Sequence, residues 1–261
     1  MKMSRTSHHP VGSWLRALLI AIWLPVALVA LWWWASESLQ SPFFPPLRAI
    51  LERFATQWLG SGFLEHAVPS LTNLLVGLVI AIVLGIALGT FLGLRKGVEE
   101  TVSPVLHFAR SLPAIALLPV MMVLFGTGPF SKTVLIFWGA FWPVLLNTID
   151  GVRLIPPQIS QMTAVYRVTP ANRLFRVTLP GAFPQISIGI TLSISIALVL
   201  MIASEIYGST QGIGYVVLTA QQSFRTVDVW AGVLLLGILG YLFSKGYSLL
   251  ETNLLRWRAV R

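Results

Sequence analysis

The chain has 261 residues, of which 56% are hydrophobic and only 10% are charged, and its 18 basic and 9 acidic side chains give a net charge of +9. An ordinary soluble domain carries about 25% charged residues, so this composition indicates an integral membrane protein. The sequence has no cysteine, which excludes disulfides and thiolate metal sites. Because the basic residues are scattered over loops, we attribute the positive charge to membrane orientation and expect no nucleic-acid partner.

Six apolar runs are long enough to cross a bilayer, which takes about 20 helical residues. They predict an all-α polytopic membrane protein in which residues 1–261 form a single transmembrane domain. The predicted spans cover residues 14–34, 68–94, 105–125, 134–152, 186–206 and 229–250. The first run follows a basic start, but it is too long for a signal peptide and no clear cleavage site follows it. We therefore expect a retained span.

The segment between the first two spans, residues 36–67, predicts a surface helix on the outer face of the membrane. It begins with a group of prolines and continues as an amphipathic run. Leu47, Ile50, Leu51 and Phe54 are expected to lie on one side of this helix.

The second predicted span carries a small residue at every fourth position, so these residues share one helix face. The stripe consists of Gly77, Ala81, Gly85, Gly89 and Gly93. Small residues let a second helix approach closely in a membrane, which favours a packing surface. A role in lining a path through the membrane is the alternative.

The distribution of basic residues predicts the orientation, because cytoplasmic loops of membrane proteins are enriched in Lys and Arg. With the N-terminus inside, the inner segments hold twelve basic residues: Lys2, Arg5, Arg16, Arg95, Lys96, Arg153, Arg167, Arg173, Arg176, Arg256, Arg258 and Arg261. The outer segments hold four: Arg48, Arg53, Lys132 and Arg225. Both termini and the loop at residues 155–184 are therefore expected to be cytoplasmic.

This loop is a polar, basic segment between two apolar runs. A short helix is predicted from Gln158 to Arg167, and Met162, Val165 and Tyr166 fall on one face of it. A second short helix is predicted after it. Because an apolar face on a short helix is unfavourable in water, we expect these helices to dock on a partner other than lipid.

The second helix is predicted to start at Thr169-Pro170, since a hydroxyl N-cap followed by proline favours a helix start. Arg173 and Arg176 lie on it. The prolines within residues 179–184 are expected to end this helix and to redirect the chain into the fifth span.

The end of the loop, LFRVTLPGAFP at residues 174–184, resembles the cytoplasmic coupling loop of binding-protein-dependent ABC importer permeases of the nitrate, sulfonate and taurine branch. The similarity extends to three further stretches: RSLPAIALLPVMMVLFGTG at 110–128, GAFWPVLLNTIDGVR at 139–153 and SEIYGSTQGIGY at 204–215. The family's loop reads Glu-Ala-Ala, three residues, and then Gly. Here Gln161-Met162-Thr163 or Met162-Thr163-Ala164 occupies the first place and Arg167 or Val168 the second, so the Glu and the Gly are absent.

The resemblance implies a type I ABC importer permease fold with a cytoplasmic coupling helix, in the inner membrane of a bacterium. It also implies four kinds of partner: a cytosolic ABC ATPase dimer, an external substrate-binding protein, a second permease copy and membrane lipid. The substrate expected from this branch is a small anion such as nitrate, taurine or an alkanesulfonate. Contact with the ATPase would be made by Met162, Thr163, Ala164, Val165, Tyr166, Arg167 and Val168.

The sequence contains no GxxxxGK[ST] phosphate loop, no HExxH pair and no GxSxG turn. We therefore expect no enzymatic activity, no cofactor and no metal site in this chain. ATP hydrolysis would belong to the partner subunits.

Five residues are candidates for the translocation path. Ser187, Thr191 and Ser195 recur every four residues, so their hydroxyls share a face that either lines water or packs between helices. Arg110, placed about one turn into the third span, is either a cationic point on an anion path, a contact to the neighbouring loop, or a group that reaches back to the inner surface. For Glu205 the resemblance suggests a gating or docking position, and the alternative is a solvated helix end.

Two other classes of protein remain open from the sequence. A secondary transporter is expected to show inverted repeats and broken helices, and we find no repeat. A membrane anchor without transport would need neither the long polar loop nor the hydroxyl stripe.

Overall fold

The computed structural model describes residues 10–39 and 41–255, and the regular structure in these ranges is helical throughout. This confirms the all-α prediction. Four helical stretches within them are long and apolar enough to cross a membrane: Phe63–Leu94, Pro129–Arg153, Pro170–Ile206 and Thr226–Leu254. A fifth candidate is a bent pair of helices. The first predicted span, residues 14–34, lies within α1 (Pro10–Leu39), where the side chains of residues 10–22 are not described. The count of six spans stays a prediction.

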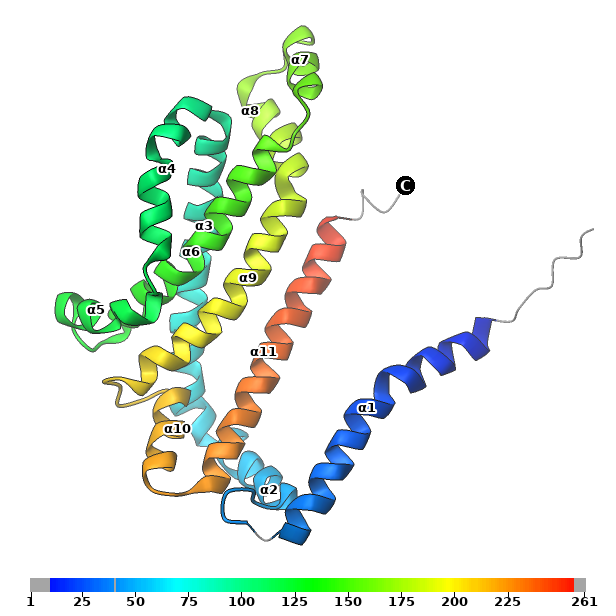
Figure 1. Ribbon diagram of the computed structural model, residues 1–261, viewed down its shortest axis with the longest axis vertical. Helices are drawn as coiled ribbons and strands as arrows, with labels where there is room; N and C mark the ends of the chain where they lie inside the picture. The colour runs from blue at the N-terminus through cyan, green and yellow to red at the C-terminus, as the bar shows by residue number, and fades with distance from the viewer. Residues whose placement is uncertain (1–9, 40, 256–261) are drawn as a thin grey trace, which may run out of the picture.

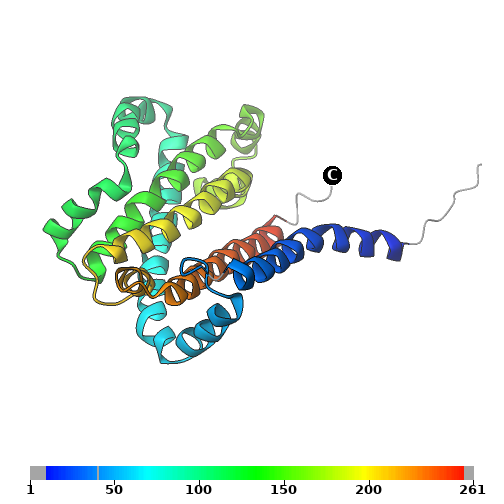
Figure 2. The same cartoon turned by 60° about the horizontal axis from the view of Figure 1, so that its bottom comes forward.

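The centre of the molecule is formed by α3 (Val68–Leu94), α6 (Pro129–Arg153) and α9 (Leu179–Ile206). α6 lies between the other two in both views (Figures 1 and 2). The hydroxyl of Ser193 on α9 donates to the carbonyl oxygen of Ala140 on α6 at 2.6 Å. The largest buried apolar side chains come mainly from these three helices, so the core is a helix sandwich built around α6.

The small-residue stripe of α3 faces α6, and the two helices approach closely along it. A Cβ atom added to Gly89 would lie 2.6 Å from Cβ of Thr148, and one added to Gly85 would lie 2.8 Å from Val144. Gly77 and Gly93 meet α6 in the same way, and Ala81 is fully buried. The stripe is therefore a surface on which α3 packs against α6. It leaves no room for a translocation path on that face of α3.

The third predicted span, residues 105–125, is not one straight helix. The expectation of a continuous helix over these residues is therefore wrong. The chain forms α4 (Lys96–Ser111), a 3₁₀ turn (Ala114–Leu117) and α5 (Leu118–Phe125), with a bend of 81° between α4 and the turn-α5 unit. The break lies at Leu112, which is extended with ψ 121°. Proline at 113 disfavours helical geometry in the residue before it, which explains the bend.

The helices predicted for the loop at residues 155–184 are confirmed in outline, and their predicted end is wrong. α7 spans Pro157–Val165, and α8 spans Pro170–Arg173 with the Thr169 hydroxyl accepting from the backbone N–H of Asn172 at 3.4 Å. This confirms the N-cap at Thr169. The prolines within 179–184 do not end the helix, because α8 continues through a π-helical turn, Leu174–Thr178, into α9. Pro180 lies two residues after this π-helical turn, inside the continuous helical stretch Pro170–Ile206.

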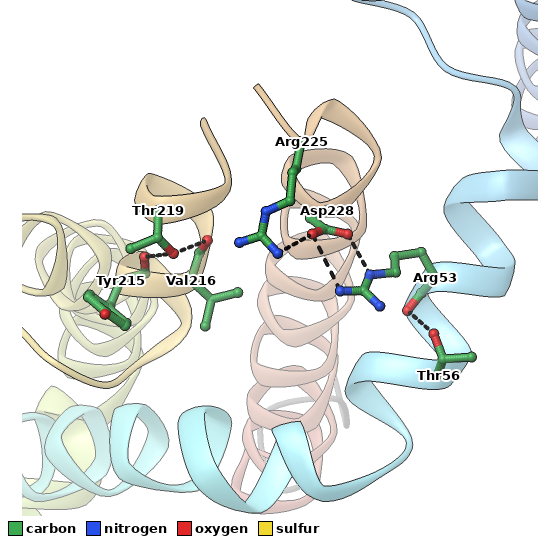
Figure 3. A network of polar contacts seen from close by, with 7 residues as sticks. All are labelled: Arg53, Thr56, Tyr215, Val216, Thr219, Arg225 and Asp228. Carbon is green, nitrogen blue, oxygen red and sulfur yellow. Dashed lines mark hydrogen bonds and ion pairs between the residues drawn. The ribbon is translucent and has the colours of Figure 1, made fainter. Parts of the chain in front are cut away.

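The surface helix predicted within residues 36–67 is α2 (Leu47–Trp58), which packs on α11 (Thr226–Leu254). Ile50 and Trp58 are buried, while Leu51 is exposed, so the predicted apolar side is narrower than expected. A polar network fixes α2: the carboxylate of Asp228 at the start of α11 binds Arg53 of α2 and, at 3.1 Å, Arg225 (Figure 3). A π-helical turn, Phe63–Ala67, then leads into α3, and α10 (Ile213–Gln222) precedes α11.

Candidate functional site

α7 and α8 lie at one end of the molecule, and α2 and α10 lie toward the other (Figure 1). At the α7 end, three apolar side chains stand in solvent: Met162 is 58% exposed, Val165 78% and Tyr166 76%. Large apolar side chains gathered on a short polar segment mark a docking surface for a partner. We call Met162, Val165 and Tyr166 the α7 face.

The other residues expected to contact the ATPase differ in their exposure. Ala164 and Arg167 are exposed, and Val168 is half-buried. Thr163 is buried instead, and its hydroxyl donates to the carbonyl oxygen of Ser160 at 2.7 Å. Its side chain lines a cavity of about 250 Å³ that lies between α7 and the ends of α3 and α6. Thr163 therefore supports α7 from inside and does not belong to the exposed face.

α7 is held against the rest of the loop by a polar contact, in which the Arg173 guanidinium donates to the hydroxyl of Ser160 at 2.6 Å. At the same end, Arg153 at the end of α6 pairs with Glu99 of α4 at 2.7 Å. Only three residues separate the end of α6 from the start of α7, and α8 runs into α9 without a break. The loop is therefore joined closely to both central helices.

Arg167 adopts a left-handed backbone conformation with φ 52°, just after the end of α7. Glycine is favoured at this place in a helix C-terminus because it has no Cβ to clash. Of the two positions that the sequence left open for the family's glycine, Arg167 has this left-handed conformation and Val168 does not. The turn is made here without glycine, at a cost of about 1–2 kcal/mol.

The hydroxyl stripe of α9 is not uniform in its surroundings. Ser187 is fully buried and its hydroxyl contacts Tyr247 at 2.9 Å and donates to Glu251 at 2.6 Å, both on α11. Thr191 is exposed and its hydroxyl donates back to the Ser187 carbonyl oxygen at 3.0 Å. Ser195 is also exposed. Ser187 therefore joins two helices, whereas Thr191 and Ser195 stand on a free surface of the single chain.

Arg110 is exposed and lies in the last turn of α4, not one turn into a span. The sequence reading misplaced it because α4 starts at Lys96, before the apolar run begins. At 1.5 Å per residue, Arg110 is about 21 Å along the helix from that start, too far for its side chain to reach back to the inner turn. It stands beside the bend at Leu112.

Glu205 is only 1% exposed, so the solvated helix end considered for it is wrong. Its carboxylate accepts from the backbone N–H of Gly214 at 2.9 Å. Two further groups bind the same loop from the start of α3: Ser70 accepts from the N–H of Ile213 at 3.0 Å, and His66 accepts from the N–H of Gly212 at 3.4 Å. These contacts anchor residues 207–214, which we call the outer loop, to the core.

One buried cation at this end was not predicted from the sequence. Lys132, counted beforehand only as an outer basic residue, is 8% exposed and donates to the hydroxyl of Ser209 in the outer loop at 2.7 Å. Asp228 and its two arginines were missed as well. The only sequence signal for Lys132 was its position just before an apolar run, three residues after the Pro129 that starts α6.

The described helices that are long and apolar enough to cross a bilayer indicate a multi-pass membrane protein. Residues 77–258 match the family described as binding-protein-dependent transport system inner membrane component, and the chain belongs to this family. The chain is a permease subunit of an ABC importer, a multi-pass inner-membrane protein, and not an enzyme. The family implies ATPase subunits and a substrate-binding protein as partners. The alternatives of a secondary transporter and of a simple anchor are therefore wrong.

Individual relatives cover nearly the whole chain. The putative aliphatic sulfonates transport permease protein SsuC of Escherichia coli (strain K12) is 32% identical over 95% of both chains. The corresponding SsuC of Bacillus subtilis (strain 168) is 30% identical over 94% of this chain and 88% of its own length. The taurine transport system permease protein TauC of Escherichia coli (strain K12) is 30% identical over 93% of this chain and 90% of its own.

A solved structure shares the fold. A chain from the inward-facing MetNI methionine ABC transporter superposes with a TM-score of 0.61 over 72% of this chain and 94% of that one, at 22% sequence identity. The two chains therefore share a fold over most of this chain.

Proposed function

We propose that this permease imports a small organic sulfonate or a related oxyanion. Support comes from the relatives, whose names give aliphatic sulfonates or taurine and which align with 93–95% of this chain. Expression with its ATPase and binding protein, in a strain without other sulfonate uptake, should permit growth on taurine or ethanesulfonate as sulfur source. Absence of growth on both, with the assembly present in the membrane, would rule out this substrate class.

We further propose that ATP-driven movement reaches the permease through the α7 face. The observation that carries this proposal is the exposure of Met162, Val165 and Tyr166 on a helix that is joined directly to α6 and α9. Closing of the ATPase dimer would displace α7, and the two central helices would move with it. The shift in equilibrium can be no larger than the difference in contact free energy between the two ATPase states.

This mechanism requires that α7 and both termini lie on the cytoplasmic side of the membrane. It is supported by the basic residues near the α7 end, which include Arg95, Lys96, Arg167 and Arg176. The terminal residues used for the same prediction, 1–9 and 256–261, lie outside the described ranges.

A cysteine placed at Asn172 tests the orientation, since the chain has no native cysteine. Asn172 is exposed on α8, so the thiol should react with an impermeant maleimide only after the membrane is opened. A cysteine at exposed Thr56 of α2 provides the matched outer control and should react in intact cells. Labelling of the Asn172 variant from outside would reverse the proposed orientation.

We propose that a second copy of the chain completes the path, and that lipid covers the outward apolar surfaces. The exposed hydroxyls of Thr191 and Ser195 would then face the water-filled interface. Cysteines at these two positions should react with small polar thiol reagents, while a cysteine at Ile190, which is 6% exposed, should react slowly. Equal protection at all three positions would remove the α9 hydroxyls from the path.

A further inference from the structure

Lys132 is a buried cation that the coupling mechanism does not use. It lies in the first turn of α6 and is 8% exposed, and its ammonium donates to the neutral hydroxyl of Ser209 at 2.7 Å. None of the ion pairs within 4.0 Å among the described residues includes it. A buried charge without a counter-charge is unfavourable, and ionisable groups within membrane proteins commonly mark a path for charged solutes.

Glu205 is the acidic residue that faces the same loop, and it is already engaged. Its carboxylate binds the N–H of Gly214 and packs under Gly212, where an added Cβ would lie 2.4 Å from the carboxyl carbon. It forms no ion pair with Lys132 within 4.0 Å. The carboxylate therefore holds the outer loop from one side, while Lys132 holds it from the other through Ser209.

A small cavity lies beside Lys132, with a volume of about 10 Å³, enough for one water molecule and too small for an organic anion. Its walls include Met121, Met122, Thr127, Ser131, Ser204 and Tyr207. The cavity can therefore admit a larger ligand only if a wall moves.

Two features of the wall suit it to movement. The outer loop contains Gly208 at φ 75° and Gly212 at φ 125°, conformations that other residues rarely adopt. Gly208 packs against the side chain of Met122, whose unbranched thioether adapts to different shapes. Displacement of the outer loop would take Ser209 away from Lys132 and open the cavity to the outside.

We propose that Lys132 is a substrate contact that binds the anionic group of the incoming solute, a sulfonate oxygen or a similar oxyanion. In the conformation seen here, the ammonium of Lys132 is hydrogen-bonded to the Ser209 hydroxyl. When the outer loop moves, an oxyanion replaces the hydroxyl, and the exchange is favourable because charge-assisted hydrogen bonds are stronger than neutral ones. This inference rests on the proposed sulfonate substrate.

The test uses the full importer in proteoliposomes, with taurine and ethanesulfonate as probes. Lys132→Met removes the charge at similar length, and we expect uptake at limiting substrate to fall at least about tenfold, the effect of losing one charged hydrogen bond. Lys132→Arg should retain most uptake. Copurification of the ATPase should be the same in all variants, because the α7 face is untouched. Lys96→Met, which removes an exposed lysine at the other end, is the matched control.

Ser209→Ala separates ligand binding from loop support, because it removes the contact that Lys132 makes in the closed conformation and leaves the ammonium in place. We expect this variant to lose much less uptake than Lys132→Met does. If Ser209→Ala lost uptake as severely as Lys132→Met, Lys132 would be a structural tie to the outer loop and the proposal would be overturned.

A chemical readout completes the test, since the parental chain lacks cysteine. In Lys132→Cys, modification by aminoethyl methanethiosulfonate should restore uptake, and the sulfonatoethyl analogue should not. Saturating taurine should slow the modification, while choline at equal ionic strength should have no effect.

The proposal is overturned if Lys132→Met transports normally, if both reagents act alike, or if taurine gives no protection. If the parental importer takes up neither sulfonate, the proposed substrate class is overturned together with this contact. That outcome is distinguishable because it is seen in the parental chain, before any substitution is made.

Discussion

A variant carrying Met162→Ala and Tyr166→Ala is expected to reach the membrane in normal amount and to lose transport. Both side chains are exposed on α7, so their truncation removes no packing from the described core. Burying a large apolar side chain in a partner is worth about 1.5–3 kcal/mol. Because about 1.4 kcal/mol corresponds to a tenfold change in affinity, loss of two such side chains should weaken ATPase docking well beyond tenfold.

Uptake of labelled substrate and the amount of copurified ATPase measure this effect. Val98→Ala serves as the control, since Val98 is a partly exposed apolar residue at the same end of the molecule on α4. Transport by the double variant at the parental rate would falsify the assignment of the α7 face as the ATPase contact. The segment Arg173–Arg176, with exposed Phe175, would then be the next candidate for the contact.

The second large effect is expected from Gly89→Val on α3. The Cβ of any side chain there would lie 2.6 Å from Cβ of Thr148 and 2.8 Å from the carbonyl oxygen of Leu145, so α3 and α6 would have to separate. Overpacking of this kind typically costs about 1–3 kcal/mol, and here it acts on the central helix pair. We expect a strong loss of folded protein and a lower thermal midpoint in detergent.

Gly97→Val is the matched control for this substitution, because nothing lies within 4 Å of a Cβ placed at Gly97. Size-exclusion profiles and thermal midpoints of the two variants should differ clearly. An unchanged profile for Gly89→Val would show that the close approach of α3 and α6 is not needed for folding.

Features that depend on local pattern were predictable from the sequence. The apolar runs predicted the helices of the core. The four-residue spacing of glycines predicted the α3 surface that packs on α6, and the Thr169-Pro170 pair predicted the start of α8. In each case the signal lies within a few residues of the feature it predicts.

Features that depend on tertiary contacts were not predictable. The bend at Leu112 was missed because the apolar run continues through it, although Pro113 was a usable signal. The continuous passage from α8 into α9 needs a π-helical turn, for which the sequence gives no sign. Lys132 and Glu205 contact residues that lie 77 and 9 positions away in the chain, so these contacts appear only in the folded structure.

The central claim is that the α7 face binds the ATPase, and the affinity of that contact tests it most directly. The permease in lipid nanodiscs can be titrated with its purified ATPase dimer, with parental, Val98→Ala and Met162→Ala/Tyr166→Ala chains side by side. We predict that the dissociation constant rises more than tenfold for the double variant and stays within about twofold for the control. Equal dissociation constants for the parental and double-variant chains would contradict the account.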